Sequence, residues 1–237
     1  MAKAVENRFR GIIDKCIDGA QSAFVPRRLI LENVLLAYEI LHMLKQKRLG
    51  KKGFMVLKLD MSKAYDRVEW NFVQEIMLRM GFTQKWIDTI MKCMSTVSYQ
   101  VVVNETIGKY FGPTKGLQQG DPLSPFLFLI CREGLSSFMR LVGREGLLKK
   151  VKVSRSGPQA TRRGASAIKE ILSEYKKCLG QSVNFDKSIV FFSRNTLEEE
   201  RRLIVSLLGV RSSSDPECYL GLPNLVGRRK KGNLFKF

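Results

Sequence analysis

An amphipathic helix is predicted near the N-terminus, because apolar side chains recur there at helical spacing. They are Leu31, Val34, Leu35, Tyr38, Leu41 and Leu44. The nearly continuous apolar run from Phe54 to Leu59 then predicts a largely buried strand, which ends in the carboxylate of Asp60. Helical spacing continues over residues 70–80 and 83–94, with Gly81 after the first helix and Thr83 as the N-cap of the second.

The middle of the chain predicts a hairpin followed by a glycine-rich loop. Residues 99–103 and 107–111 are rich in Val, Ile and aromatic side chains and flank the polar loop 104–106. After the loop, Ser124 as N-cap and Pro125 as first helical residue predict a helix to about Leu141.

The last third predicts a helix, a strand and another helix. The first helix presents one apolar face, ends at Gly180 and precedes a strand over residues 189–192. Thr196 and Glu199 have the spacing of a capping box for a helix that reaches Leu208, with Gly209 after it. Because helices and strands do not alternate regularly, the predicted fold class is α+β.

The charge balance points to a polyanionic partner. The 237 residues include 41 Lys+Arg and 22 Asp+Glu, a net charge of +19, so nucleic acid is the first expected partner and an anionic membrane surface the second. Short basic clusters carry part of this excess: Lys51-Lys52, Lys149–Lys152, Arg162-Arg163 and Arg228–Lys231.

Several other classes of protein are disfavoured by composition. A hydrophobic content of 44% argues against intrinsic disorder. The apolar runs are too short to cross a bilayer, and the chain opens with no secretory signal. The five cysteines are widely spaced without a C-x-x-C pair, so neither a disulfide framework nor structural zinc is expected.

Two segments are candidates for chemistry. In Leu57–Val68, Asp60 follows a buried strand, and a carboxylate in that position can bind Mg²⁺. Asp60 could instead simply cap the following turn. In Gly116–Pro125, the glycines allow close backbone approach and Gln119 offers a donor and an acceptor. The helix that starts at Ser124 favours negative charge at its end, but an ordinary loop before a capped helix would have the same composition.

Taken in order, five segments resemble the reverse transcriptases of plant LINE-type (non-LTR) retrotransposons. The segments are Gln21–Pro26 with Arg28, Leu57–Val68, Gly116–Pro125, Gly180–Ser188 and Tyr219–Pro223. The resemblance implies a fragment of a right-hand polymerase, comprising fingers and an antiparallel palm sheet packed on helices. Residues 1–226 would form this partial domain, and residues 227–237 would form a basic tail.

The resemblance also implies catalytic roles. Asp60 would bind Mg²⁺ for two-metal addition of deoxynucleotides to a primer. Tyr65 would pack under the sugar and exclude the 2′-OH of a ribonucleotide, and Lys187 would assist the leaving pyrophosphate. Tyr65 could instead be a core residue, and Lys187 an ordinary surface lysine.

The implied partners are an RNA template with a DNA primer or an RNA–DNA duplex, and deoxynucleoside triphosphates, without a membrane. Expected binding residues are Arg28 and Lys63 at phosphates, Gln119, Gly120, Ser124 and Pro125 at nucleotide and template, and Tyr219, Leu220 and Gly221 at the primer. Such a protein would act inside the cell, in the nucleus or the cytoplasm.

One motif of that family is not found. Its members carry a hairpin with paired aspartates between the second and the lysine-containing motifs, and this sequence has no Asp-Asp pair. A deletion of roughly 15 residues near Gln159, about the length of one hairpin, would explain this. Asp66, Asp121 and Asp186 lie in contexts that make them poor replacements.

The expected consequence is a copy without polymerase activity, whose central catalytic hairpin is missing. Both ends also look shortened relative to the family. Two alternatives remain open: a non-catalytic basic module that binds RNA or DNA, and a poorly folded product without function.

Overall fold

The structure is a computed structural model that describes residues 2–50, 53–144 and 160–214. Several sequence predictions therefore lie outside the described residues. They are the deletion near Gln159, the primer-binding residues Tyr219, Leu220 and Gly221, the tail 227–237, and every basic cluster except Arg162-Arg163.

Helices and short strands follow one another irregularly, which confirms the α+β class. The helices are α1 Ala2–Arg10, α2 Ile13–Cys16, α3 Ile30–Gln46, α4 Trp70–Arg79, α5 Gln84–Ser95, α6 Ser124–Arg144, α7 Arg162–Leu179 and α8 Glu198–Leu208. The strands are β1 Met55–Lys58, β2 Met61–Ser62, β3 Val102–Val103, β4 Thr106–Ile107, β5 Ser182–Val183, β6 Ile189–Phe192 and β7 Arg211–Ser212.

The largest sheet has the order β1-β6-β7. β1 and β6 are antiparallel, with Met55 opposite Phe192 and Lys58 opposite Ile189. β7 joins β6 in parallel, which the predicted antiparallel sheet did not include. The reason is that α8 lies between β6 and β7, and such a crossover returns the chain in the same direction.

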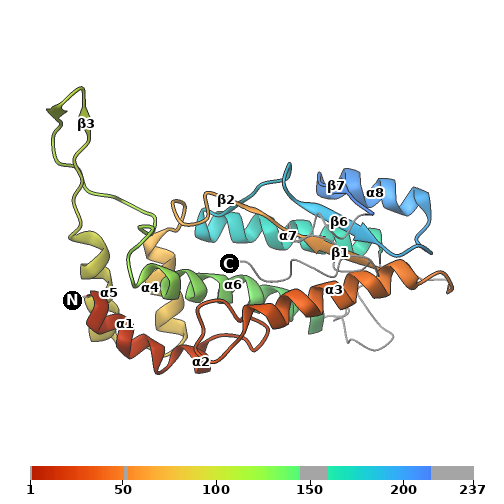
Figure 1. Ribbon diagram of the computed structural model, residues 1–237, viewed down its shortest axis with the longest axis horizontal. Coiled ribbons are helices and arrows are strands. Elements are labelled where there is room, and N and C mark those ends of the chain that lie inside the picture. Colours follow the sequence, from red (N-terminus) through yellow and green to blue (C-terminus); the bar gives the residue numbers. More distant parts are fainter. Residues whose placement is uncertain (1, 51–52, 145–159, 215–237) are drawn as a thin grey trace, which may run out of the picture.

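This sheet is covered by helices on both faces (Figure 1). On one face, Met55 and Val190 pack against α7 and α8, whereas on the other Phe54 and Phe191 pack against α3. The predicted apolar face of α3 is buried only toward its C-terminal end, at Leu41 and Leu44. Leu31 and Leu35, nearer its start, are 64% and 62% exposed.

A second core joins α1, α2, α4, α5 and α6. Phe9 of α1 is fully buried, with ring centroids 5.8 to 6.1 Å from those of Phe82, Trp86 and Phe126. α7 reaches this core too, through Tyr175 and Leu179, and therefore connects the two halves of the molecule.

The structure confirms the predicted glycine ends of two helices, but only part of what was predicted for the Ser and Thr caps. α7 and α8 end at Gly180 and Gly209, both in the left-handed conformation, as predicted. The predicted capping box is wrong: the N-cap of α8 is Leu197, and the buried Thr196 instead contacts the Ser193 hydroxyl at 3.1 Å. Thr83 is the N-cap of α5, as predicted, but its side chain makes no capping hydrogen bond.

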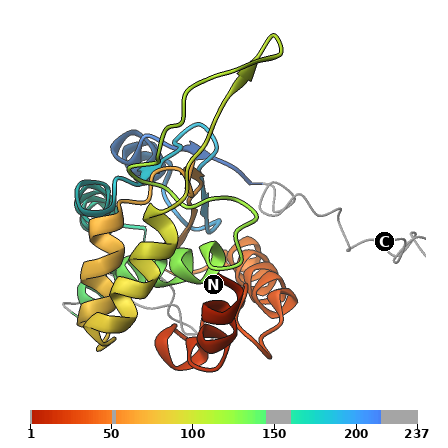
Figure 2. The same ribbon diagram turned by 90° about the vertical axis from the view of Figure 1, so that its left-hand side faces the viewer.

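The predicted hairpin is present and projects from the body of the molecule (Figures 1 and 2). Its turn has two central residues, Asn104 and Glu105, with φ of +47° and +64°. Positive φ at both positions is the signature of a type I′ turn, which matches the twist of the paired strands.

No helix in the described part of the chain has both the length and the apolar character needed to span a membrane.

Candidate functional site

Asp60 lies between β1 and β2, and its backbone is held by the segment that contains Lys187. β2 pairs with β5, which places residues 182–188 beside the strand end. The Asp60 carbonyl oxygen accepts a hydrogen bond from the Asn184 amide at 2.8 Å. The Asp60 amide donates to the Ser188 hydroxyl at 3.0 Å, so both backbone groups of Asp60 are fixed.

Ser188 is the centre of this arrangement. It is fully buried, and its hydroxyl donates to the Asn184 carbonyl at 2.7 Å while accepting from Asp60. The neighbouring Lys187 donates its backbone amide to the Asn184 side chain at 3.3 Å, and Lys187 as a whole is exposed. The structure thus brings the two predicted motifs together and leaves the lysine at the surface.

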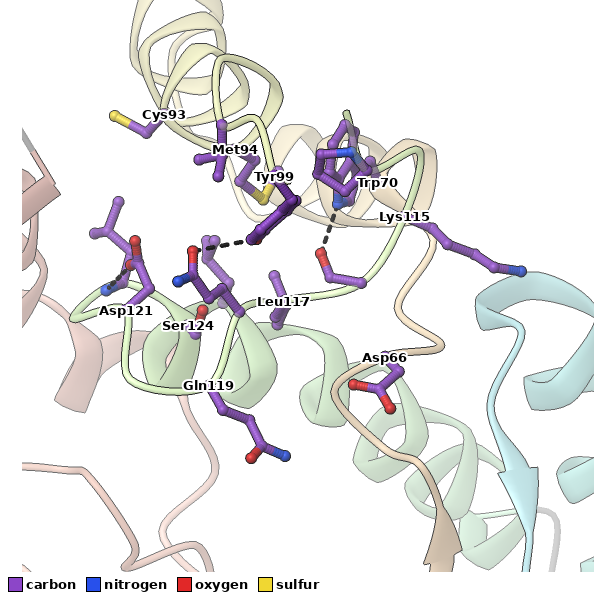
Figure 3. Close-up of a pocket in the computed structure, with 16 residues that line it drawn as sticks. Asp66, Trp70, Cys93, Met94, Tyr99, Lys115, Leu117, Gln119, Asp121 and Ser124 are labelled. Atoms are coloured by element: carbon purple, nitrogen blue, oxygen red, sulfur yellow. Dashed lines mark hydrogen bonds between the residues drawn. The ribbon is translucent and has the colours of Figure 1, made fainter. Parts of the chain in front are cut away.

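The turn after Asp60 is bound to the glycine-rich loop. The Leu117 amide donates to the Tyr65 carbonyl at 2.9 Å, and the Gly116 amide donates to the Val68 carbonyl at 2.8 Å. The indole of Trp70 donates to the Gly116 carbonyl at 2.7 Å (Figure 3). These bonds set the position of the loop relative to Asp60.

Tyr65 is half-buried, and its ring stacks on Phe128 of α6. The ring centroids are 4.7 Å apart, with 19° between the planes. Burial raises the pKa of the Tyr65 hydroxyl, so the side chain is neutral at physiological pH. Tyr65 is therefore held by the helix that follows the glycine-rich loop.

The loop itself borders a cavity of about 510 Å³, lined by side chains from α4, α5 and residues 113–127 (Figure 3). Gln119 is exposed, and its side chain extends away from Tyr99 across the loop (Figure 3). Gly120 is exposed with φ of +90°. The cavity is lined by Asp66 but not by Asp60, the predicted catalytic carboxylate.

The start of α6 differs in detail from the prediction. Ser124 is buried and is the first helical residue, with Pro125 second, whereas the sequence placed Ser124 as the cap. The Asp121 carboxylate accepts from the Leu123 amide at 2.7 Å just before the helix. A carboxylate that accepts from the backbone amide two residues later forms an Asx-turn. This turn was not predicted from the sequence.

The two basic residues expected at phosphates have different surroundings. Arg28 donates to the Asp14 carboxylate and to carbonyl oxygens of Asp14, Ile17, Asp18 and Gln21. All the N–H groups of its guanidinium are thereby used within residues 14–21, so Arg28 braces its own segment. Lys63 is exposed, with φ of +47° in the turn after Asp60.

The described residues do not fit a two-metal centre. Among residues 2–50, 53–144 and 160–214, no group of three His, Cys, Asp or Glu is arranged to hold a metal ion. Asp66 lines the neighbouring cavity and is exposed, and Asp186 is exposed on the loop after β5. Two Mg²⁺ ions beside a triphosphate require several anionic ligands, which Asp60 does not supply alone.

Sequence reasoning missed the residues that hold this site together, notably Asn184, Ser188 and Trp70. Each acts through a contact with a residue far away in the chain, for which a single sequence offers little signal. Asn184 and Ser188 do lie in the segment identified by resemblance, so their amide and hydroxyl groups could have been proposed as partners for the Asp60 turn.

The sequence of this chain is similar to those of known proteins. A family model for reverse transcriptase (RNA-dependent DNA polymerase) matches residues 1–145. The retrovirus-related Pol polyprotein of the type-1 retrotransposable element R2 from Nasonia vitripennis is 32% identical over 112 residues, which is 47% of this chain. That alignment covers 11% of the polyprotein, so this chain spans only a small part of its relative.

Two further similarities were found. An uncharacterized mitochondrial protein of Arabidopsis thaliana is 47% identical over 47 residues, covering 20% of this chain and 38% of that protein. A structure of apo telomerase from Candida tropicalis aligns with 81% of this chain and 39% of its own, at 16% identity and a TM-score of 0.49.

Proposed function

Because this chain belongs to the reverse transcriptase (RNA-dependent DNA polymerase) family, we propose that it binds an RNA template with its DNA primer but adds no nucleotides. The binding surface would comprise the Asp60 turn, the segment 182–188 and the loop 116–124. Support for binding comes from the hydrogen bonds that join these segments and from the net charge of +19.

The absence of nucleotide addition is proposed from the environment of Asp60. No group of three potential metal ligands occurs in the described residues, and the full sequence contains no Asp-Asp pair. An internal deletion near Gln159 would have removed the paired aspartates. Loss of metal ligands removes the charge stabilisation on which nucleotidyl transfer depends.

We also infer that the domain derives from a plant LINE-type, non-LTR element. Similarity to the R2 polyprotein supports the non-LTR class, and similarity to the Arabidopsis protein supports a plant origin. In the bound complex, Gln119 and Gly120 would contact nucleotide and template, and Lys63 and Lys187 would approach phosphates.

Binding is tested with a fluorescently labelled RNA–DNA duplex and anisotropy measured over a range of salt concentrations. We expect affinity to fall steeply with salt and to depend little on sequence, because phosphates dominate the contact. No binding at low salt would contradict the proposal. A cooperative melting transition monitored by circular dichroism distinguishes this binding module from a poorly folded product.

Catalysis is tested by primer extension on a primed RNA template with deoxynucleotides and Mg²⁺ or Mn²⁺. We expect no extension above a protein-free control, and an identical result for Asp60→Asn. Extension that is lost in Asp60→Asn would show a working metal centre and would overturn this part of the proposal.

A further inference from the structure

The hairpin of residues 99–111, hereafter the arm, exposes an unusual amount of apolar surface. Every residue from 101 to 110 is exposed. The large apolar side chains and their exposed fractions are Val101 53%, Val102 64%, Val103 61%, Ile107 65%, Tyr110 73% and Phe111 51%. A two-stranded hairpin standing alone is only marginally stable in water, and contiguous apolar surface of this kind marks an interaction site.

The base of the arm is hydrogen-bonded to the glycine-rich loop. Tyr99 and Phe111 exchange backbone hydrogen bonds of 2.8 and 3.0 Å. The Tyr99 hydroxyl donates to the Gln118 side chain at 3.2 Å, and both residues line the same cavity (Figure 3). A ligand held at the loop would therefore lie at the foot of the arm.

The chemistry of the arm suits an unpaired nucleic-acid strand. Aromatic faces stack on bases of any sequence, and Tyr110 is the most exposed ring of the arm. Glu105 and Lys109 are its only charged residues, so the arm adds stacking surface and not net charge. A second copy of the chain is a poor occupant, because two proteins of charge +19 repel each other.

We propose that the arm is a stacking platform for a single-stranded stretch of nucleic acid that continues from the loop at Gln118. This inference rests on the proposed function, and it extends the nucleic-acid surface by a region outside the palm motifs. Tyr110 would provide the stacking face, and the paired Val102 and Ile107 add exposed apolar surface elsewhere in the arm.

The test measures binding of labelled single-stranded RNA and of a fully paired RNA–DNA duplex to the whole chain. We expect Tyr110→Ala to weaken single-strand binding about tenfold, as for loss of one base–aromatic stack, with a smaller effect on the duplex. The slope of affinity against salt should not change, because Tyr110 carries no charge. Tyr110→Phe retains the ring and should bind within about twofold of the wild type.

Leu49→Ala is the matched control, since Leu49 is 87% exposed and lies outside the arm. Melting curves for all variants verify that the fold is retained. Wild-type binding with an unchanged affinity in Tyr110→Ala would overturn the role of the arm while the proposed function stands. If the wild type bound neither the single-stranded RNA nor the RNA–DNA duplex, both the role of the arm and the proposed function would be overturned.

Sedimentation velocity provides an independent outcome. We expect a monomer across the concentration range used for binding. A concentration-dependent dimer that Val102→Glu disrupts would show that the arm binds a second copy, and would overturn the nucleic-acid assignment.

Discussion

The surroundings of Asp60 and the arm are two regions with opposite properties. At Asp60, backbone groups from three distant segments are joined by hydrogen bonds, and Ser188 is fully buried. In the arm, paired residues are few and every side chain from 101 to 110 is exposed. The first region therefore contributes to the stability of the fold, whereas the second can contribute to binding without stabilising the body.

This contrast shows that the fold around Asp60 can form without a set of metal ligands. The scaffold around Asp60 is assembled although no group of three potential metal ligands occurs in the described residues. The strand end, turn and loop depend on backbone hydrogen bonds and packing, which do not require paired aspartates. The proposed nucleic-acid binding therefore does not depend on whether the chain holds a metal centre.

The largest expected loss of stability is for Gly116→Ala. Gly116 has φ of +87°, and an added Cβ would lie 2.9 Å from the Asp66 carbonyl oxygen. Backbone strain and this contact together should lower the free energy of unfolding by about 2–4 kcal/mol in urea titrations. Gly120→Ala is the matched control, with φ of +90° and no atom within 4 Å of the new Cβ.

Because Gly120→Ala carries only the backbone strain, its loss should be about 1–2 kcal/mol. Equal losses in the two variants would show that the approach of the loop to Asp66 is not tight. That result would contradict the description of this region as closely joined.

Ser188→Ala is expected to have the next largest effect. It removes the acceptor of the Asp60 amide, which is left unpaired beside a buried position. It also removes one of the two donors to the Asn184 carbonyl, which still accepts from the Ser188 backbone amide at 3.0 Å. A loss of about 2 kcal/mol in the free energy of unfolding is expected. Ser206→Ala, at an exposed position on α8, serves as the control and should change stability by less than about 0.5 kcal/mol.

Trp70→Phe tests the bond between α4 and the loop. The variant keeps an aromatic ring but loses the indole donor to the Gly116 carbonyl, so we expect a loss of about 1 kcal/mol. Trp86→Phe is a matched control, because the buried indole nitrogen of Trp86 has no hydrogen-bond partner among the described residues. If both variants lost the same stability, ring volume rather than the hydrogen bond would account for it.

Local patterns in the sequence were sufficient to predict many elements, because those elements depend on neighbouring residues. The strand over residues 189–192, the glycine ends of α7 and α8, and the hairpin were all predicted this way. The type I′ turn differs only by one residue from the predicted loop.

Features that depend on tertiary contacts were not predicted. The pairing of β2 with β5 joins residues more than a hundred positions apart, and β7 adds to the sheet in parallel after the chain has crossed over through α8. The hydrogen bonds from Arg28 to residues 14–21 were not predicted either. Leu31 and Leu35 share the helical period of α3, but the sheet ends before it covers them.

The smallest expected effect on stability is in the arm, and it is the sharpest test of the contrast. Val102→Thr keeps the shape of the side chain and replaces a methyl group with a hydroxyl at a position that is 64% exposed. Because no buried surface is lost, the free energy of unfolding should change by less than about 0.5 kcal/mol in the same urea titrations. A loss above about 1 kcal/mol would mean that the arm packs against the body in solution, since a hydroxyl is that costly only where water is excluded. The arm would then be part of the stable scaffold, and its apolar side chains would not be available to a nucleic-acid strand.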